Sequence, residues 1–319
     1  MTAVRQFHRV SAPHCGTVRG VVLISIRSRI SDSVAGLFAH GTQPLQDTAL
    51  FPGDRGLCGP GSVSWKVIGD VSAFLGGIRA LLVQSAHPEV VAGVEDHSRY
   101  REDPLGRLNR TSYFVTTATF GAMPEVESAV GKVRAAHRGV VGLSSRNLAY
   151  SASTPELAAW VHNTLTDSFL VAYREFGLGL TTGEADRFVA EQTRIGEMLD
   201  ADPIPATAAE LSEWVRSHPA LEPSPGMRSA VKFLRRPPIP TLPLWGYRVL
   251  MQGAAATIPP EIRKVLGVEP GPGARPAAGA LVRALRWAMR NSPAWKASLE
   301  RCGEPYDPRQ FRQFADPRR

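Results

Sequence analysis

Histidines are the side chains in this sequence whose placement could most directly do chemistry. One of the eight, His137, lies in the run GKVRAAHRGVVG, residues 131–142. It belongs to a series of residues spaced alternately four and three positions apart: Val126, Val130, Val133, His137 and Val140. This is helical spacing, so the pattern predicts a helix over 125–141 with His137 on its buried face. Such an imidazole can ligate haem iron, or it can be a core histidine bonded to a backbone carbonyl. Periodicity alone favours the core histidine.

Three more histidines fall in the same apolar helical block: His87, His97 and His162. None of the four shows the i, i+4 pairing or the H-E-x-x-H word of a zinc protease. They could still converge in space around a non-haem iron or zinc ion, and Glu95 and Asp96 stand beside His97. The remaining histidines lie in the N-terminal segment or before a proline, and we expect them to be solvated: His8, His14, His40 and His218.

Other catalytic sequence motifs are absent. GLSSRN is not a G-x-S-x-G elbow, and GGIRAL lacks the glycine spacing of a nucleotide loop. The three cysteines, Cys15, Cys58 and Cys302, form no C-x-x-C pair, which excludes a disulfide framework, a cysteine zinc site and covalent haem attachment. Cysteine usage of this kind favours a reducing compartment, so we expect a cytoplasmic protein. We expect no transmembrane segment, because no apolar run approaches about 18 residues.

Charge is concentrated at the two ends of the chain. The net charge is +8, with +5 in residues 1–31 and +3 in residues 309–319, while the stretch between them has 28 basic and 28 acidic residues. A nucleic-acid module needs a basic stripe on its folded surface. The neutral body therefore argues against nucleic acid as a partner.

The elements that must position these residues are helical. With 319 residues, 43% of them hydrophobic, the chain can form one large all-α domain over 51–300, after an irregular N-terminal segment (1–50) and before a C-terminal tail (301–319). Thr154 and Pro155 cap and begin a helix that is apolar nearly all round, to residue 176, as expected of a central helix. Residues 142–153 are predicted to be a loop. Proline-rich breaks separate later helices at about 245–256, 260–266 and 278–300.

Four segments together resemble a known family: GGIRALLVQSAHPEVVAGVEDHSRYREDPLGRLNRT, TFG, VRAAHRGVVG and YSASTPELAAWVHNTLTDSFLVAYREF. They are similar to the oxygenase family named after MpaB of the mycophenolic-acid pathway, which includes the catalytic domain of latex clearing protein, the rubber oxygenase. The similarity covers about residues 55–300. It implies a distantly globin-like helical fold that binds a non-covalent haem b and uses O2.

The resemblance also implies site residues. The R-x-x-H word maps the proximal iron ligand onto His137, with Arg134 before it. The R-x-x-K-T word of the haem pocket reads RLNRT here, so Arg107 and Thr111 match but Arg110 replaces the lysine. A guanidinium stays protonated and is a poor iron ligand, so a lysine-capped iron is not expected and rubber is not implied as the substrate.

The leading hypothesis is a haem b-dependent oxygenase for a small hydrophobic or lipid-like substrate, with His137 as the iron ligand. Arg107 and Arg134 would pair with propionates or orient oxygen, and Thr111 would support that pocket. His87, His97 and His162 lie inside segments that match the family and would support the cofactor or the structure. Trp160 and Phe169 would pack in the core. Two alternatives remain: a non-haem metalloenzyme using the four helical histidines, and a cofactor-free helical binding protein. The oligomeric state is left open.

Overall fold

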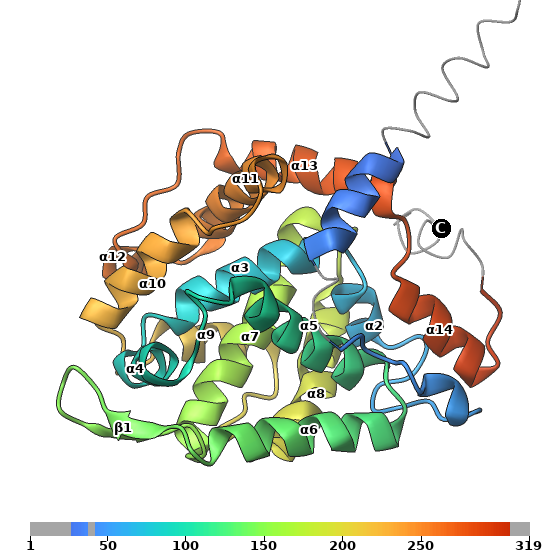
Figure 1. Ribbon diagram of the computed structural model, residues 1–319, viewed down its shortest axis with the longest axis horizontal. Coiled ribbons are helices and arrows are strands. Elements are labelled where there is room, and N and C mark those ends of the chain that lie inside the picture. Colours follow the sequence, from blue (N-terminus) through green and yellow to red (C-terminus); the bar gives the residue numbers. More distant parts are fainter. Residues whose placement is uncertain (1–26, 38–41, 307–319) are drawn as a thin grey trace, which may run out of the picture.

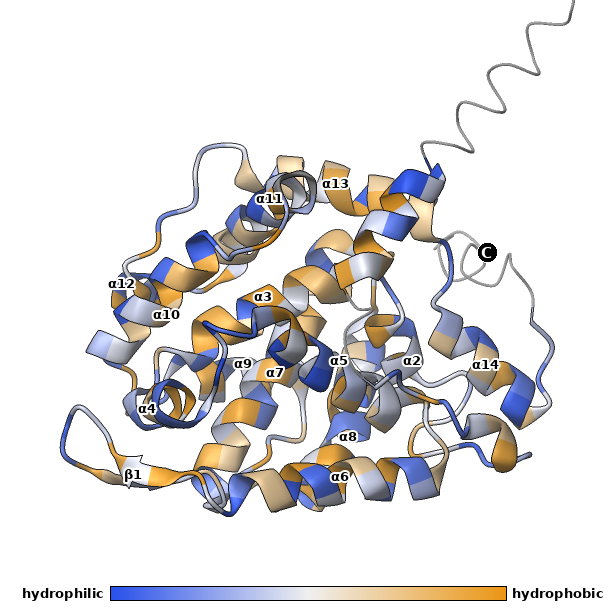
Figure 2. Ribbon diagram, in the orientation of Figure 1, coloured by the Kyte–Doolittle hydropathy of each residue, from blue (hydrophilic) through white to orange (hydrophobic). Residues whose placement is uncertain are grey.

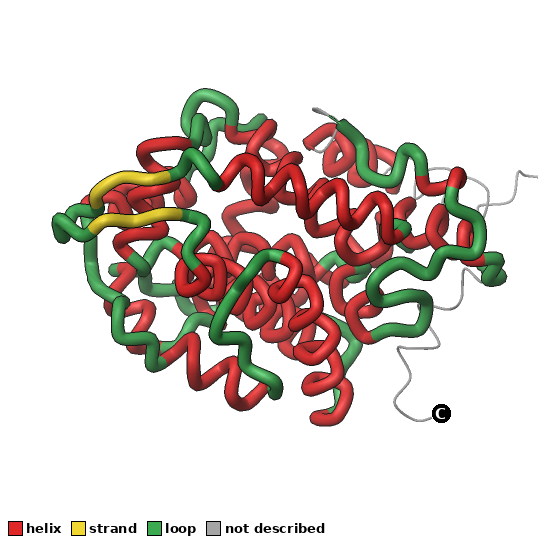
Figure 3. The backbone as a smooth tube through the Cα atoms, turned by 90° about the horizontal axis from the view of Figure 1, so that it is seen from below, coloured by secondary structure: helices red, strands yellow, loops and turns green. Residues whose placement is uncertain are grey.

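A long central helix, α7 (Pro155–Phe176), organises the molecule. The computed structural model describes residues 27–37 and 42–306, so His8, His14 and His40 lie outside the described residues. The described part is helical apart from loops and one two-stranded hairpin, which lies at one end of the molecule (Figure 3). The prediction of a single all-α domain is confirmed. The elements in chain order are η1 (Thr48–Leu50), α2 (Val63–Ile68), α3 (Ser72–Gln84), α4 (Pro88–His97), α5 (Pro104–Phe120), α6 (Met123–His137), β1 (Val141–Leu143), β2 (Ala149–Ser151), α7, α8 (Thr182–Met198), α9 (Ala208–Arg216), α10 (Pro225–Arg235), α11 (Thr241–Thr257), α12 (Pro260–Leu266), α13 (Ala274–Met289) and α14 (Pro293–Cys302).

The helix pair α3 and α7 forms the centre of the core. A Cβ atom placed on Gly76 of α3 would lie only 2.8 Å from the Phe169 ring of α7, so glycine permits this close approach. Arg79 of α3 is fully buried and donates to Asp167 and Ser168 of α7 at 2.7 and 2.8 Å. Trp160 and Phe169 are buried, as predicted for packing residues. The sequence of α3 is mostly hydrophobic in keeping with this position (Figure 2).

A second layer, α10 to α13, covers α3 from one side (Figure 1). The helices α11 and α13 run antiparallel and pack closely, because a Cβ atom on Gly253 would lie 2.3 Å from the Cβ of Ala278. Arg286 of α13 reaches back to the core and pairs with the buried carboxylate of Asp70 at 2.7 Å. That ion pair ties the second layer to the start of α3.

On the other side of the core, α5 and α6 form a helical hairpin that turns at Gly121 and Ala122. The turn end is fixed by an aromatic cluster of Trp65, Phe120 and Trp295, in which the indole of Trp65 donates to the carbonyl of Thr119 at 2.7 Å. A Cβ atom on Gly121 would lie 2.5 Å from the carbonyl oxygen of Thr117, so the tight turn requires glycine.

Several segments differ from their predicted form. The helix carrying His137 ends at that residue rather than at 141, and the predicted loop that follows contains the β1–β2 hairpin, in register Val141↔Ser151. The hairpin forms because Tyr150 is buried and donates to Asp96 at 2.5 Å, a contact with α4 that local sequence does not reveal.

The predicted helical piece 278–300 is two helices, α13 and α14, separated at Arg290, which has a positive φ of 59°. Within the N-terminal segment predicted to be irregular, residues 27–37 form a helix whose Ile30 and Val34 pack against the core. None of the helices in the described residues is both long enough and apolar enough to cross a bilayer.

Candidate functional site

The α5–α6 hairpin is closed at its turn and open at its other end. All the buried residues of α5 fall in its last four positions, 117–120, and those of α6 are Val126, Ala129 and Val130, near its start. The remaining lengths of both helices are partly or fully exposed. The two helices therefore separate with distance from the turn, as Figure 1 shows. This open end carries Arg107 and Thr111 on α5 and His137 on α6.

His137 lies at the last position of α6 and is half-buried. On the same face of α6, Val126 and Val130 are buried and Val133 is half-buried, so the predicted valine face exists but is less covered toward His137, and Val140 lies beyond the end of the helix. Within the described part of the chain the imidazole makes no hydrogen bond. Burial lowers the pKa of His137 below its ordinary value. The ring is therefore neutral near pH 7, with a free nitrogen lone pair and an unused N–H.

Arg107 stands on the first turn of α5 and is directed toward the chain that precedes this helix. Its guanidinium donates to the hydroxyl of Ser98 and lies 6.0 Å from the centre of the Tyr100 ring. Burial, followed by the neighbouring charge of Arg110, lowers the pKa of Arg107. The hydroxyl of Thr111 donates to the carbonyl of Arg107 at 3.2 Å, which leaves its oxygen lone pairs outward.

Arg110 and Arg134, by contrast, are each paired with an acidic side chain. Arg110 is exposed and lies 3.5 Å from the carboxylate of Asp103. Arg134 pairs with Asp200, just after α8, at 2.5 Å. Arg134 therefore contacts the end of α8 and the residues after it rather than α5.

His87 lies in a buried aromatic cluster rather than near His137. Its ring centre lies 5.6 Å from that of Trp160 and 5.3 Å from that of His218. Burial, and then the proximity of His218, lowers the pKa of His87 to about 4. Its Nδ1 is 3.3 Å from a Glu89 oxygen, but the angles do not make a hydrogen bond. His218, expected to be solvated, is instead part of this cluster, because Trp214 packs on it at 4.9 Å.

The other two helical histidines occupy separate environments. His97 is exposed, with Nε2 3.0 Å from the carbonyl oxygen of Val141. His162 is buried against Gly196 of α8, where burial lowers its pKa to about 4 against a smaller opposing effect of a hydrogen bond with the Gln192 backbone. In the described ranges there is no group of three or more histidine, cysteine or acidic side chains able to hold a metal ion. The four histidines are thus not brought together.

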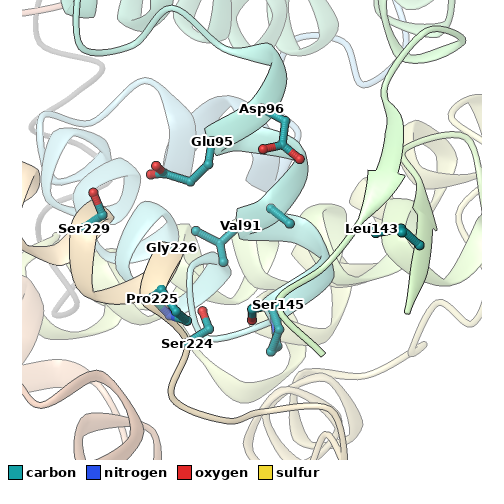
Figure 4. Close-up of a pocket in the computed structure, with 11 residues that line it drawn as sticks. Val91, Glu95, Asp96, Leu143, Ser145, Ser224, Pro225, Gly226 and Ser229 are labelled. Carbon is teal, nitrogen blue, oxygen red and sulfur yellow. The ribbon is translucent and has the colours of Figure 1, made fainter. Parts of the chain in front are cut away.

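A cavity of about 370 Å³ lies between α4, the β1–β2 hairpin and the start of α10. Figure 4 shows Glu95 and Asp96 on one wall, opposite Ser224 and Ser145. Both acids already have partners, since Tyr100 and Arg101 donate to Glu95 and Tyr150 donates to Asp96. None of the residues at the open end of α5–α6 lines this cavity.

Two features of the site region were missed by sequence reasoning. Glu89 is buried and accepts from Ser144 at 2.7 Å and from Arg146, which anchors the hairpin turn to α4. In addition, apolar side chains from three helices, Phe74, Val115 and Leu165, lie only partly buried at the edge of the core. The helical periodicity of each segment predicts apolar faces, but it does not show which of them remain uncovered.

Residues 65–291 match the family model described as ER-bound oxygenase mpaB/B′/Rubber oxygenase, catalytic domain. The matched range runs from α2 into the residues just after α13 and includes the whole α5–α6 hairpin. No curated protein and no solved structure matches the chain.

Proposed function

Because the chain belongs to the mpaB/rubber oxygenase catalytic-domain family, whose members are oxygenases, we propose that it is a haem b-dependent oxygenase acting on a small hydrophobic substrate with O2. His137 is the proposed iron ligand. The observation that carries this assignment is the open end of the α5–α6 hairpin, where the half-buried imidazole on the last turn of α6 has a pKa lowered by burial and makes no hydrogen bond with any residue that the structure describes.

The residues present fit a haem group in their donor chemistry. A metal-binding imidazole must be neutral, and the lowered pKa of His137 keeps it so. A haem also needs apolar surroundings. In this proposal the partly buried apolar residues of α3, α5 and α7 at the edge of the core would supply these, and a Cβ atom on Gly77 of α3 would meet no atom within 4 Å. A haem b held by His137 would supply the one-electron and O2 chemistry that amino-acid side chains lack.

The side chains of the chain itself have binding and orienting roles. His137 would bind the iron through one ring nitrogen, which leaves its other N–H available to a hydrogen-bond acceptor. Arg107, partly buried beside Tyr100, would place a positive charge at the α5 side of the opening. The outward lone pairs of Thr111 could accept a hydrogen bond there. Arg110 forms an exposed ion pair with Asp103 and would not cover the open end of the α5–α6 hairpin.

Arg134 has a different role in this proposal from the one that the sequence predicts. Its ion pair with Asp200 would fix the last turn of α6 relative to α8, and so would position His137. His87 and His162 would stabilise the helices around the site. His97 would stabilise the start of the β1–β2 hairpin. A joint non-haem metal site is not favoured, because these rings are held in separate environments.

The visible absorption spectrum of the purified full chain tests the proposal. After addition of haemin we expect a Soret band from a stoichiometric complex, and His137→Gly should lower haemin affinity by at least tenfold. Added imidazole should restore the band in His137→Gly, because it can occupy the vacated position. His97→Ala is the matched control and should bind haemin normally.

The rival functions give different results. Stoichiometric iron or zinc in a protein with no Soret band would favour the non-haem metalloenzyme. A folded protein that binds neither haemin nor metal would favour the cofactor-free binding protein. Circular dichroism of each variant distinguishes loss of a ligand from loss of the fold.

A further inference from the structure

The body of the chain is neutral only in sum. Residues 32–222 contain 15 basic and 23 acidic residues, a net charge of −8, whereas residues 223–290 contain 11 basic and 2 acidic residues, a net charge of +9. The basic range forms α10 to α13, the layer that covers α3 on one side (Figure 1). The charge of the folded body is therefore separated between its layers, and the α10–α13 layer is strongly positive.

Two exposed tryptophans lie at one end of this layer. Trp245, near the start of α11, is 66% exposed, and Trp287, near the end of α13, is 45% exposed. A Cβ atom on Gly246 would lie 3.9 Å from Leu281, so these two antiparallel helices bring the start of α11 beside the last part of α13. Trp287 is six residues beyond Leu281, about 9 Å along the helix. The two indoles therefore share one end of the helix pair.

Arginines without acidic partners lie within about one helical turn of the two tryptophans along the chain. Within the described ranges, Arg248, Arg283 and Arg290 form no ion pair, and all three are exposed. Arg27, at the start of the helix 27–37, bonds to the carbonyls of Trp287 and Ala288, with its guanidinium 5.3 Å from the indole of Trp287. We call Trp245, Trp287 and these four arginines the basic indole face.

Two positively charged side chains of this face, Arg27 and Arg290, lie close to each other. Burial, and then the charge of Arg290, lowers the pKa of Arg27, so the two guanidinium groups are close enough to repel each other. Arg290 has a positive φ of 59°, a conformation that L residues rarely adopt. Both features disfavour the isolated folded protein, and an anion placed between the two arginines would relieve the repulsion.

We propose that the basic indole face binds the surface of a bilayer that contains anionic phospholipids. Tryptophan is the residue that most readily occupies the headgroup level of a bilayer, with its ring in the apolar zone and its N–H toward water. Arginines attract anionic headgroups, at about fivefold in partitioning per residue. The face supplies both, side by side.

The outer surface of α13 favours a lipid surface over nucleic acid. Between the charged residues it exposes Ala277, Ala280 and Ala284, which can bury apolar area against lipid but cannot donate or accept hydrogen bonds with a phosphate backbone. Contacts to nucleic-acid phosphates come mostly from polar and basic side chains. The apolar stripe and the tryptophans are thus better explained by a bilayer interface. The inference stands on these surface residues and is independent of the proposed oxygenase activity.

Vesicle co-sedimentation of the purified full chain tests the proposal. We expect binding to vesicles of phosphatidylcholine with 30% phosphatidylserine, little binding to phosphatidylcholine alone, and release at high salt, since screening weakens the attraction. The double variant R248E/R283E should lower partitioning by at least about 30-fold. The double variant W245A/W287A should lower it by at least about tenfold, without a change in surface charge.

Two single variants separate binding from folding. Arg290→Gly should weaken vesicle binding about fivefold while raising the midpoint of chemical unfolding, because glycine adopts a positive φ without strain. Leu143→Ser removes an exposed apolar side chain on the hairpin, at the other side of the molecule, and should bind vesicles as the unmodified chain does.

The proposal is overturned by three results. R248E/R283E could bind anionic vesicles as strongly as the unmodified chain, which would assign the binding to another part of the sequence. W245A/W287A could bind unchanged, which would remove the indoles from the interface. The chain could also bind a DNA duplex and not vesicles, which would make the face a nucleic-acid surface.

Discussion

Buried neutral histidines should make this protein markedly less stable at mildly acidic pH. Burial lowers the pKa of both His87 and His162 to about 4, against 6.5 for the free side chain. Between these two values the unfolded chain binds protons that the folded chain does not, so the free energy of unfolding falls as pH falls through this window. The loss is complete only below pH 4, and the full stability contribution is present above pH 6.5.

The magnitude follows from the size of the shift. A pKa difference of about 2.5 units corresponds to about 3 kcal/mol for each histidine over the whole window, since one unit is about 1.4 kcal/mol. By pH 5 each has lost about 2 kcal/mol, and the pair about 4 kcal/mol. That is a large share of the 5–15 kcal/mol typical of a folded domain. The lowered pKa values of His137 and His218 act in the same direction.

Urea unfolding at pH 8 and at pH 5 measures this loss. His162→Gln should be less stable than the unmodified chain at pH 8, but should lose about 2 kcal/mol less on going to pH 5. His97→Gln, which removes an exposed imidazole, is the matched control. If His162→Gln loses as much between pH 8 and pH 5 as the unmodified chain, His162 is not a buried neutral histidine and the reasoning is refuted.

Two further predictions concern the core. Arg79→Met should lower the free energy of unfolding by about 3–5 kcal/mol, because it leaves the buried carboxylate of Asp167 without its partner; adding Asp167→Leu should recover most of that loss in urea unfolding, and no recovery would mean that the pair is not coupled. Gly253→Val should separate α11 from α13, because its side chain would collide with Ala278, at a cost of about 1–3 kcal/mol; hydrogen exchange should rise in these two helices, and unchanged exchange there would contradict the close packing.

Much of the helical framework could be predicted from local sequence. Pro155 after Thr154 marks the start of α7, and the apolar residues around that helix predict its central position, as observed. The β1–β2 hairpin could not be predicted, because each strand has three residues, too few to show the alternation of apolar and polar residues that marks a strand. It depends on Tyr150 reaching Asp96, 54 residues earlier in the chain.

The candidate residues could be named from the sequence, but their arrangement in space could not. Helical periodicity correctly indicates that His137 shares a face with Val126 and Val130. It does not show that this face is covered at one end and open at the other, because coverage depends on the angle between α5 and α6. The direction of Arg134 depends likewise on Asp200, in the loop after α8. The assignment of iron to His137 remains a prediction.

The separation of charge between the layers gives the molecule a permanent electric dipole. Near a negatively charged plane, a dipole of this kind experiences a torque as well as an attraction, so the α10–α13 layer turns toward the plane before contact is made. Helix α6 lies on the opposite side of the molecule from α11 and α13 (Figure 1), so it would then face the aqueous phase. Orientation would thus be selected during approach, and the rate of productive encounters would fall with ionic strength even where the final contact is apolar.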